Sequence, residues 1–275
     1  MKNRNKLQPI ILLLLLLSTL NACAKSTKKN SKVNVSQPKT GTVVAPTPKA
    51  TANIQAELNR AKKAGKAVFL IVTATGVPDA GKALTLANKT NEKYKNATVV
   101  TLNRDDAANA NLVNQWRLVG APLPLILVVS PKGTPVGGLE LKEATVEKLL
   151  NIVPTPKEDE VYAALNNKKS VFVVIAKKTN TDRAIVLEKC KAANTQLKSA
   201  GTIIEIDPTD AKEQKFIKML NYKNTPNTSS VFVFNASGQS TGTFSGEMET
   251  KELVTAATKV IRSCCAGGGS CSPKK

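Results

Sequence analysis

The segment KAVFLIVTATGVPDAGKAL, at residues 66–84, recurs with changes as KSVFVVIAKKTNTDRAIVL at residues 169–187. Each copy contains an unbroken apolar run that ends in a polar turn, which is typical of a strand buried on both faces. A segment with apolar residues at helical spacing follows each turn. The recurrence indicates that the chain contains the same structural unit twice.

Two more pairs of similar segments follow in the same order. ATVVTLNRDDAANANLVNQW (97–116) matches GTIIEIDPTDAKEQKFIKML (201–220), and each is predicted as a strand that enters an acidic turn able to cap a helix. LILVVSPKGTPVGGLEL (125–141) matches SVFVFNASGQSTGTFSG (230–246), and each is predicted as a hairpin. The offsets between the copies run only from 103 to 105 residues, so we infer a tandem duplication.

Apolar residues at a spacing near 3.6 predict helices between and after these strands. They are Leu84, Ala87, Tyr94, Val146, Leu149 and Leu150 in the first unit, and Val186, Cys190, Ala193, Leu197, Leu253, Ala257 and Val260 in the second. A strand, helix, strand connection needs a right-handed crossover and gives a parallel pair, to which the late hairpin adds an antiparallel edge. We therefore predict an α/β protein with two tandem domains, residues 51–155 and 156–262, each a mostly parallel four-stranded sheet with an antiparallel edge hairpin and helices on both faces.

The run VGAPLPLIL (119–127), continued by SPKG (130–133), has a proline just before the third strand of the first unit. With the element order, this run makes residues 52–262 resemble the thioredoxin-like superfamily. The resemblance implies a cis proline at this place. Pro124 is the candidate rather than Pro122, because Pro124 has the family's distance to the turn at Gly133.

Family members that exchange disulfides carry a C-x-x-C pair at the start of the helix after the first strand, where the helix N-terminus lowers the pKa of the first thiol. The equivalent positions here run from Val77 to Ala80 in the first unit and from Asn180 to Arg183 in the second, and neither stretch contains cysteine. Ser229 stands in the second unit where Pro124 stands in the first. The resemblance thus implies the fold without its dithiol site, and ordinary thiol exchange is not expected there.

The chain begins with a cationic segment and an apolar run over residues 9–20, as secretory signals do. Residues 20–23, Leu-Asn-Ala-Cys, resemble a bacterial lipobox, which implies that residues 1–22 are a signal peptide and that Cys23 is lipidated. A plain signal or an uncleaved anchor is the alternative. Residues 23–50 are rich in lysine and lack acids, which predicts a disordered tether. We expect a membrane-anchored protein of the cell envelope, at the outer membrane facing the periplasm in a Gram-negative host.

The sequence has 40 basic and 20 acidic residues, a net charge of +20, and no histidine. Histidine bases, histidine metal ligands and histidine pH switches are therefore excluded. A large part of the basic excess lies in residues 1–50 and in the last two lysines, and only three tyrosines and one tryptophan are present to stack on bases. No phosphate-binding glycine motif is present, so neither nucleic acid nor a nucleotide is an expected partner.

Cysteine placement leaves only the C-terminal end for sulfur chemistry. Cys190 falls on the apolar face of a predicted helix, so core packing is expected for it. Cys264, Cys265 and Cys271 lie in a flexible tail, residues 263–275. These three thiols are the catalytic candidates for disulfide exchange, and they are also candidate ligands of Cu(I) or another thiophilic ion. An inert or cross-linking tail is a third possibility.

The acidic pairs Asp105–Asp106 and Asp207–Asp210 each follow a strand and precede a helix, so capping accounts for them better than catalysis does. The sequence therefore favours a binding or scaffold module with an envelope protein as partner, and not an independent enzyme. The alternatives are a disulfide carrier that uses the tail and a metal-binding tail.

Overall fold

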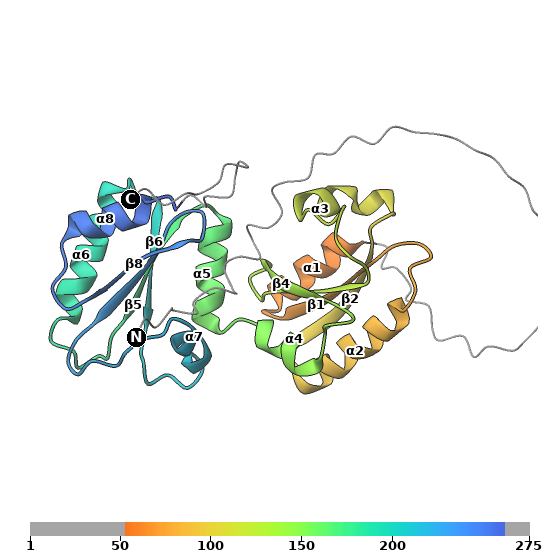
Figure 1. Cartoon of the computed structure of the whole chain (residues 1–275), viewed down its shortest axis with the longest axis horizontal. Coiled ribbons are helices and arrows are strands. Elements are labelled where there is room, and N and C mark those ends of the chain that lie inside the picture. Colours follow the sequence, from red (N-terminus) through yellow and green to blue (C-terminus); the bar gives the residue numbers. More distant parts are fainter. Residues whose placement is uncertain (1–52, 262–275) are drawn as a thin grey trace, which may run out of the picture.

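A computed structural model describes residues 53–261 (Figure 1). The first half contains α1 (Ile54–Lys63), β1 (Ala67–Thr73), α2 (Ala80–Lys93), β2 (Ala97–Asn103), the 3-10 helix η2 (Ala107–Asn109), α3 (Ala110–Gln115), β3 (Leu125–Val129), β4 (Pro135–Glu140) and α4 (Val146–Ile152). The second half contains α5 (Pro156–Asn166), β5 (Ser170–Ile175), α6 (Arg183–Gln196), β6 (Gly201–Ile206), α7 (Gln214–Met219), β7 (Ser230–Phe234), β8 (Ser240–Ser245) and α8 (Thr250–Thr258).

The two halves have the same sheet topology. Their strand orders are β2-β1-β3-β4 and β6-β5-β7-β8. In each sheet the first two strands are parallel, and the third and fourth run antiparallel to their neighbours. Figure 1 shows the two sheets side by side along the molecule, each with its own helices. The duplicated thioredoxin-like fold predicted from the sequence is confirmed.

One detail of the predicted sheets is wrong, because they are mixed and not mostly parallel. β3 runs antiparallel to β1, with Leu70 opposite Leu127, so only one of the three pairings is parallel. The sequence pattern could not orient this strand, because an apolar run that is buried on both faces looks the same whether the strand runs parallel or antiparallel to its neighbour.

The first strand of each half lies at the centre of its core. All seven residues of β1 and all six of β5 are buried, and their side chains alternate between the two faces of the sheet. In the first half, Leu70 packs with α1 and α3, whereas Phe69 packs with α2 and α4. In the second half, Phe172 packs with α6 and α8, whereas Val173 packs with α5 and α7. Burial on both faces explains why both strands are continuous apolar runs.

No helix within residues 53–261 is long and apolar enough to cross a membrane. The predicted signal peptide (1–22), the lipidated Cys23 with its tether (23–50), and the tail (263–275) with Cys264, Cys265 and Cys271 lie outside the described residues. Lipidation, thiol exchange and binding of a thiophilic ion therefore stay predictions of the sequence.

Candidate functional site

The first-half equivalent of the family's dithiol site is a short loop between β1 and α2. Val77 is half-buried in this loop, and Ala80 is the first residue of α2. The backbone of Asp79, directly before the helix, is left-handed, with φ 64°. Asp105 Oδ2 accepts a hydrogen bond of 2.9 Å from the Thr75 N–H, which ties the loop to the end of β2. The loop is therefore positioned by an acid that the sequence analysis assigned to capping.

Pro124 lies next to this loop at the start of β3. It is buried, and the Leu123–Pro124 peptide bond is cis. The loop before it is fastened by Arg104, whose Nη1 donates to the carbonyl oxygens of Leu118 at 3.3 Å and of Ala121 at 2.8 Å. The sequence analysis missed this role of Arg104, because nothing in the spacing of residues links the end of β2 to a loop fourteen or more residues further on.

A hollow of about 360 Å³ opens beside Pro124. Its lining residues come from the start of α2, from the proline loop and from the end of β4: Asp79, Lys82, Leu123, Pro124, Glu140, Leu141 and Lys142. Two exposed ion pairs border it, Lys82 with Asp79 at 2.8 Å and Lys142 with Glu140 at 2.5 Å. Exposed pairs of this kind are worth less than about 1 kcal/mol each, so they leave the rim open to competing ligands.

Leu123 supplies main-chain hydrogen-bonding groups at this hollow. Neither its N–H nor its C=O bonds to another residue in the described part of the chain. The neighbouring Pro124 differs, because its C=O accepts a hydrogen bond of 3.1 Å from the Leu141 N–H. The groove thus presents one unused donor and one unused acceptor on a backbone that Arg104 holds in place.

The same place in the second half is closed by internal hydrogen bonds. Asp182 accepts from the Ser229 N–H at 2.8 Å and from the Ser229 hydroxyl at 2.6 Å. Thr228, the counterpart of Leu123, donates its N–H to the Thr225 carbonyl oxygen at 3.3 Å. Asn180 is buried beside Ser229, and Arg183 forms an ion pair of 2.5 Å with Glu205. Asn180 and Arg183, the predicted second-half equivalents of the dithiol positions, therefore both have structural partners.

Asp182 was not predicted as a site residue, although a signal was present. It stands 103 residues after Asp79, at the offset of the first pair of repeated segments. The two carboxylates have different partners, Lys82 for Asp79 and Ser229 for Asp182. Only the folded chain brings Asp182 to Ser229.

Cys190 is the only cysteine within residues 53–261, and it is a core residue, as predicted. It is fully buried in α6 among apolar neighbours from the sheet and α8. Burial raises the pKa of its thiol to about 12. Since the thiolate is the reactive form, Cys190 is not an exchange nucleophile.

The acidic pairs after β2 and β6 bind backbone amides. Asp106 accepts from the Ala108 N–H at 2.9 Å, Asp207 from the Thr209 N–H at 2.9 Å, and Asp210 from the Lys212 N–H at 2.9 Å. Capping is thus confirmed for Asp106, which caps η2, whereas Asp207 and Asp210 close turns before α7 and Asp105 instead binds the Thr75 N–H. In the described part of the chain no group of three or more acidic or cysteine side chains is arranged to hold a metal ion.

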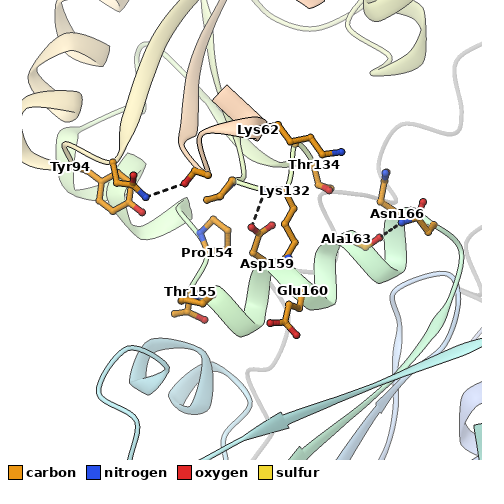
Figure 2. Close-up of a pocket in the computed structure, with 16 residues that line it drawn as sticks. Lys62, Tyr94, Lys132, Thr134, Pro154, Thr155, Asp159, Glu160, Ala163 and Asn166 are labelled. Atoms are coloured by element: carbon orange, nitrogen blue, oxygen red, sulfur yellow. Dashed lines mark hydrogen bonds between the residues drawn. The ribbon is translucent and has the colours of Figure 1, made fainter. Parts of the chain in front are cut away.

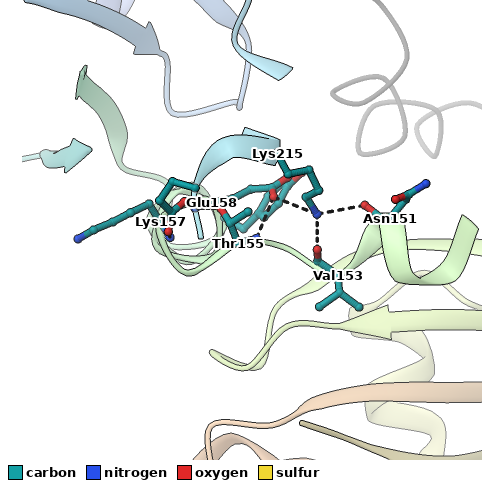
Figure 3. Close-up of polar contacts among 8 residues, drawn as sticks. Asn151, Val153, Thr155, Lys157, Glu158 and Lys215 are labelled. Carbon is teal, nitrogen blue, oxygen red and sulfur yellow. Dashed lines mark hydrogen bonds and ion pairs between the residues drawn. The ribbon is translucent and has the colours of Figure 1, made fainter. Parts of the chain in front are cut away.

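A polar network joins the two halves at the start of α5 (Figure 3). Thr155 caps α5 in a capping box with Glu158, and its hydroxyl donates to Glu213 Oε2 at 2.6 Å. Glu213 is 2% exposed and also accepts from the Lys157 N–H at 3.0 Å. Lys215 Nζ donates to the carbonyl oxygens of Val153 and of Asn151, the latter at 3.2 Å, and lies 3.5 Å from Glu158 Oε2.

The junction also encloses a cleft of about 750 Å³ between the turn at residues 131–134 and α5 (Figure 2). Asp159 of α5 points toward this turn, and its Oδ2 accepts from the Lys132 N–H at 3.0 Å. Asp159 is 3% exposed, and its Oδ1 has no hydrogen-bond partner in residues 53–261. Burial raises the pKa of Asp159, against opposing effects of the Ser130 hydroxyl and of Lys132.

Comparison with known proteins gives no family model and no curated protein that matches this chain. Solved structures of thioredoxin-domain proteins do match. The first two thioredoxin domains of Saccharomyces cerevisiae Eps1p are 14% identical, with 78% of this chain and 98% of that chain covered and a TM-score of 0.29. ERdj5 (form II) is 15% identical, the match covers 76% of this chain and 27% of that chain, and the TM-score is 0.32. Zinc-bound human ERp44 is 9% identical, the match covers 76% of this chain and 59% of that chain, and the TM-score is 0.32. Likenesses this low carry no argument about function, and the fold assignment rests on the strand order above.

Proposed function

We propose that this chain is a lipid-anchored, extracytoplasmic protein with two thioredoxin-like domains that acts as a binding or scaffold module. Its first half would hold an extended segment of an envelope protein in the groove beside Pro124. The observation that carries the proposal is the unused N–H and C=O of Leu123 at the rim of an open hollow. Main-chain groups of this kind bind extended peptides through their backbone, while nearby pockets select side chains.

The two halves differ in their free main-chain groups, which supports a binding groove in the first half only. In the second half the Thr228 N–H is used by Thr225, and the Ser229 N–H is used by Asp182. A peptide would have to break these bonds before it could form its own. Asp182 is half-buried, so losing its partner would cost up to about 1–3 kcal/mol, which is comparable to the gain from one or two new hydrogen bonds.

The chemistry of the two loops supports binding rather than exchange. Exchange requires a thiolate at the start of the helix, and the stretches from Val77 to Ala80 and from Asn180 to Arg183 contain no cysteine. Cys190 is buried in the core and remains protonated at neutral pH because its pKa is raised to about 12. Without a thiolate, the residues that surround the groove do not exchange disulfides, which favours the binding of a partner.

Membrane attachment is proposed from the leader and from Cys23. The proposed lipid on Cys23, followed by the tether over residues 24–50, would keep the binding half near the bilayer. Mass spectrometry of the protein taken from its native membrane would measure the modification directly. A mature chain whose first residue is not an acylated Cys23 would contradict the anchor without affecting the groove.

The binding proposal is tested by peptide selection followed by nuclear magnetic resonance. Peptides selected from a displayed heptapeptide library on the full chain are synthesised and titrated into isotope-labelled protein. We expect the amide resonance of Leu123 to shift with saturation, while that of Thr228, the matched position, stays unchanged. Selected peptides that leave Leu123 unperturbed, or that perturb both amides equally, would contradict the proposal.

A photo-crosslinking residue provides an independent test. Placed at Lys82, on the rim of the hollow, it should form an adduct with a selected peptide. Placed at Ile185, which is 61% exposed and stands at the equivalent position of α6, it should not. Equal adduct yields at the two positions would argue against a groove confined to the first half.

A further inference from the structure

β4 is an edge strand, paired only with β3. The Leu141 N–H bonds to the Pro124 C=O, and residues in an antiparallel ladder alternate between bonding inward and pointing outward. Gly137 and Leu139 therefore bond to β3, whereas Gly138 and Glu140 direct their main-chain groups to the free edge. Because β4 pairs with β3 alone, the outward-directed Gly138 N–H and C=O and Glu140 N–H have no strand partner within residues 53–261. The Glu140 C=O is used by the N–H groups of Glu143 and Ala144.

This free edge borders a cleft of about 520 Å³, distinct from the Pro124 hollow. The first half contributes residues 136–139 of β4 and the end of α4, and the second half contributes side chains of α5 and α7. β4 lies on the side of its sheet that faces α5 (Figure 1). Leu139, Ile152 and Met219 are half-buried and give the cleft an apolar lining. A strand laid along β4 would place alternate side chains against this lining.

The charges at the cleft favour an acidic occupant. Glu158, Lys215 and Lys218 are its charged lining residues. Lys215 lies 3.5 Å from Glu158, so these two offset each other. Lys218 is exposed on α7 and makes no ion pair with the described residues. A carboxylate on the occupant would pair with Lys218.

Two other occupants fit less well. Residues 24–50 of this chain contain six lysines and no acid, so Lys218 would repel them. A second copy of this chain that paired through its own β4 would bring its helices, each about 10 Å across, against this edge. Side chains of α5 and α7 line the opposite wall of the cleft, so a sheet with its helices would meet them, whereas a single strand is much narrower.

We propose that an extended segment of another protein, apolar at alternate positions and carrying an acidic residue, adds to β4 as a fifth strand in this cleft. The segment receives hydrogen bonds from the Gly138 and Glu140 N–H groups and donates to the Gly138 C=O. Its carboxylate pairs with Lys218. Strand addition of this kind takes affinity from the backbone and selectivity from the side chains.

The probe is the peptide acetyl-TVEVTV-amide, titrated calorimetrically into the full chain. Two N-methylated versions carry methyl groups at residues 1, 3 and 5 or at residues 2, 4 and 6. Because alternate N–H groups face β4, one version should bind like the parent, and the other, which loses the bond to the Gly138 C=O, should bind about twofold to tenfold more weakly. Equal binding of the two versions, or no binding of the parent at millimolar concentration, would overturn the proposal.

Charge and location are tested with matched variants. Lys218→Glu should weaken binding of the parent peptide about twofold to fivefold. Lys223→Glu, in an exposed loop outside the cleft, should leave the binding unchanged. Hydrogen exchange at Gly138 and Glu140 should slow when the peptide is bound, while exchange at Leu123 stays unchanged. Protection at Leu123 alone would assign the peptide to the Pro124 groove and overturn strand addition at β4.

Discussion

Thr155 connects the cap of α5 to a buried carboxylate, so its removal should have a larger effect than the loss of an ordinary cap. Its hydroxyl accepts from the Glu158 N–H at 3.3 Å and donates to Glu213 Oε2 at 2.6 Å. Replacing an N-cap threonine by alanine costs about 1 kcal/mol. Leaving a buried carboxylate oxygen without its donor costs about 1–3 kcal/mol more. We expect Thr155→Ala to lower the free energy of unfolding by about 2–4 kcal/mol.

Two variants separate these contributions. Thr155→Ser keeps the hydroxyl and loses one methyl group, so it should cost less than about 1 kcal/mol. Thr145→Ala removes the cap of α4, where the Thr145 hydroxyl accepts from the Lys148 N–H at 3.2 Å and has no carboxylate partner in the described residues. That variant should cost about 1 kcal/mol. The difference between Thr155→Ala and Thr145→Ala then measures the bond to Glu213.

Urea unfolding followed by two signals is the assay. Far-ultraviolet circular dichroism reports both halves, whereas the fluorescence of Trp116, the single tryptophan, reports the first half. Because α5 packs on β5 and β6, Thr155→Ala should shift the second-half transition more than the Trp116 transition. The reasoning would be refuted if Thr155→Ala lay within about 0.5 kcal/mol of the wild type, or if Thr155→Ser were as destabilising as Thr155→Ala.

Three further predictions concern the core, the junction and the thiol. Leu149→Ala, at a fully buried position of α4, should lower the free energy of unfolding by about 2–5 kcal/mol in the Trp116 transition, and a loss under 1 kcal/mol would contradict the packing. Because burial raises the pKa of Asp159, the folded state favours its protonated form, and the cost of its charge appears as pH rises through the raised pKa. Asp159→Asn should therefore unfold at a higher temperature than the wild type at neutral pH. This difference should narrow toward pH 4, and a difference that stays constant with pH would count against this account. Cys190 should resist iodoacetamide in the native chain and react after unfolding, as measured by peptide mass spectrometry, and rapid native labelling would show that the core is open there.

The fold was predictable because its signals are local in the sequence. A strand buried on both faces must be apolar throughout, so β1 and β5 appear as uninterrupted runs such as AVFLIVT. The nearly constant offset between the copies, 103 to 105 residues, indicated the duplication, and the absence of cysteine at the dithiol positions was visible from residue identity alone. The direction of β3 was not predictable in the same way. An apolar run buried on both faces has the same pattern in either direction, so only the assembled sheet reveals that β3 runs antiparallel to β1.

The functional surfaces depend on contacts between residues far apart in the chain. The sequence identified Pro124 and the loop at Val77, but the closure of the second groove needs Asp182 and Ser229, 47 residues apart, to meet. The junction likewise needs Thr155 and Glu213, 58 residues apart. Residue type and spacing specify which segments become strands and helices, because those choices depend on near neighbours. Which donors and acceptors remain unused is a property of the packed chain, since each group is satisfied or left free only once distant segments come together.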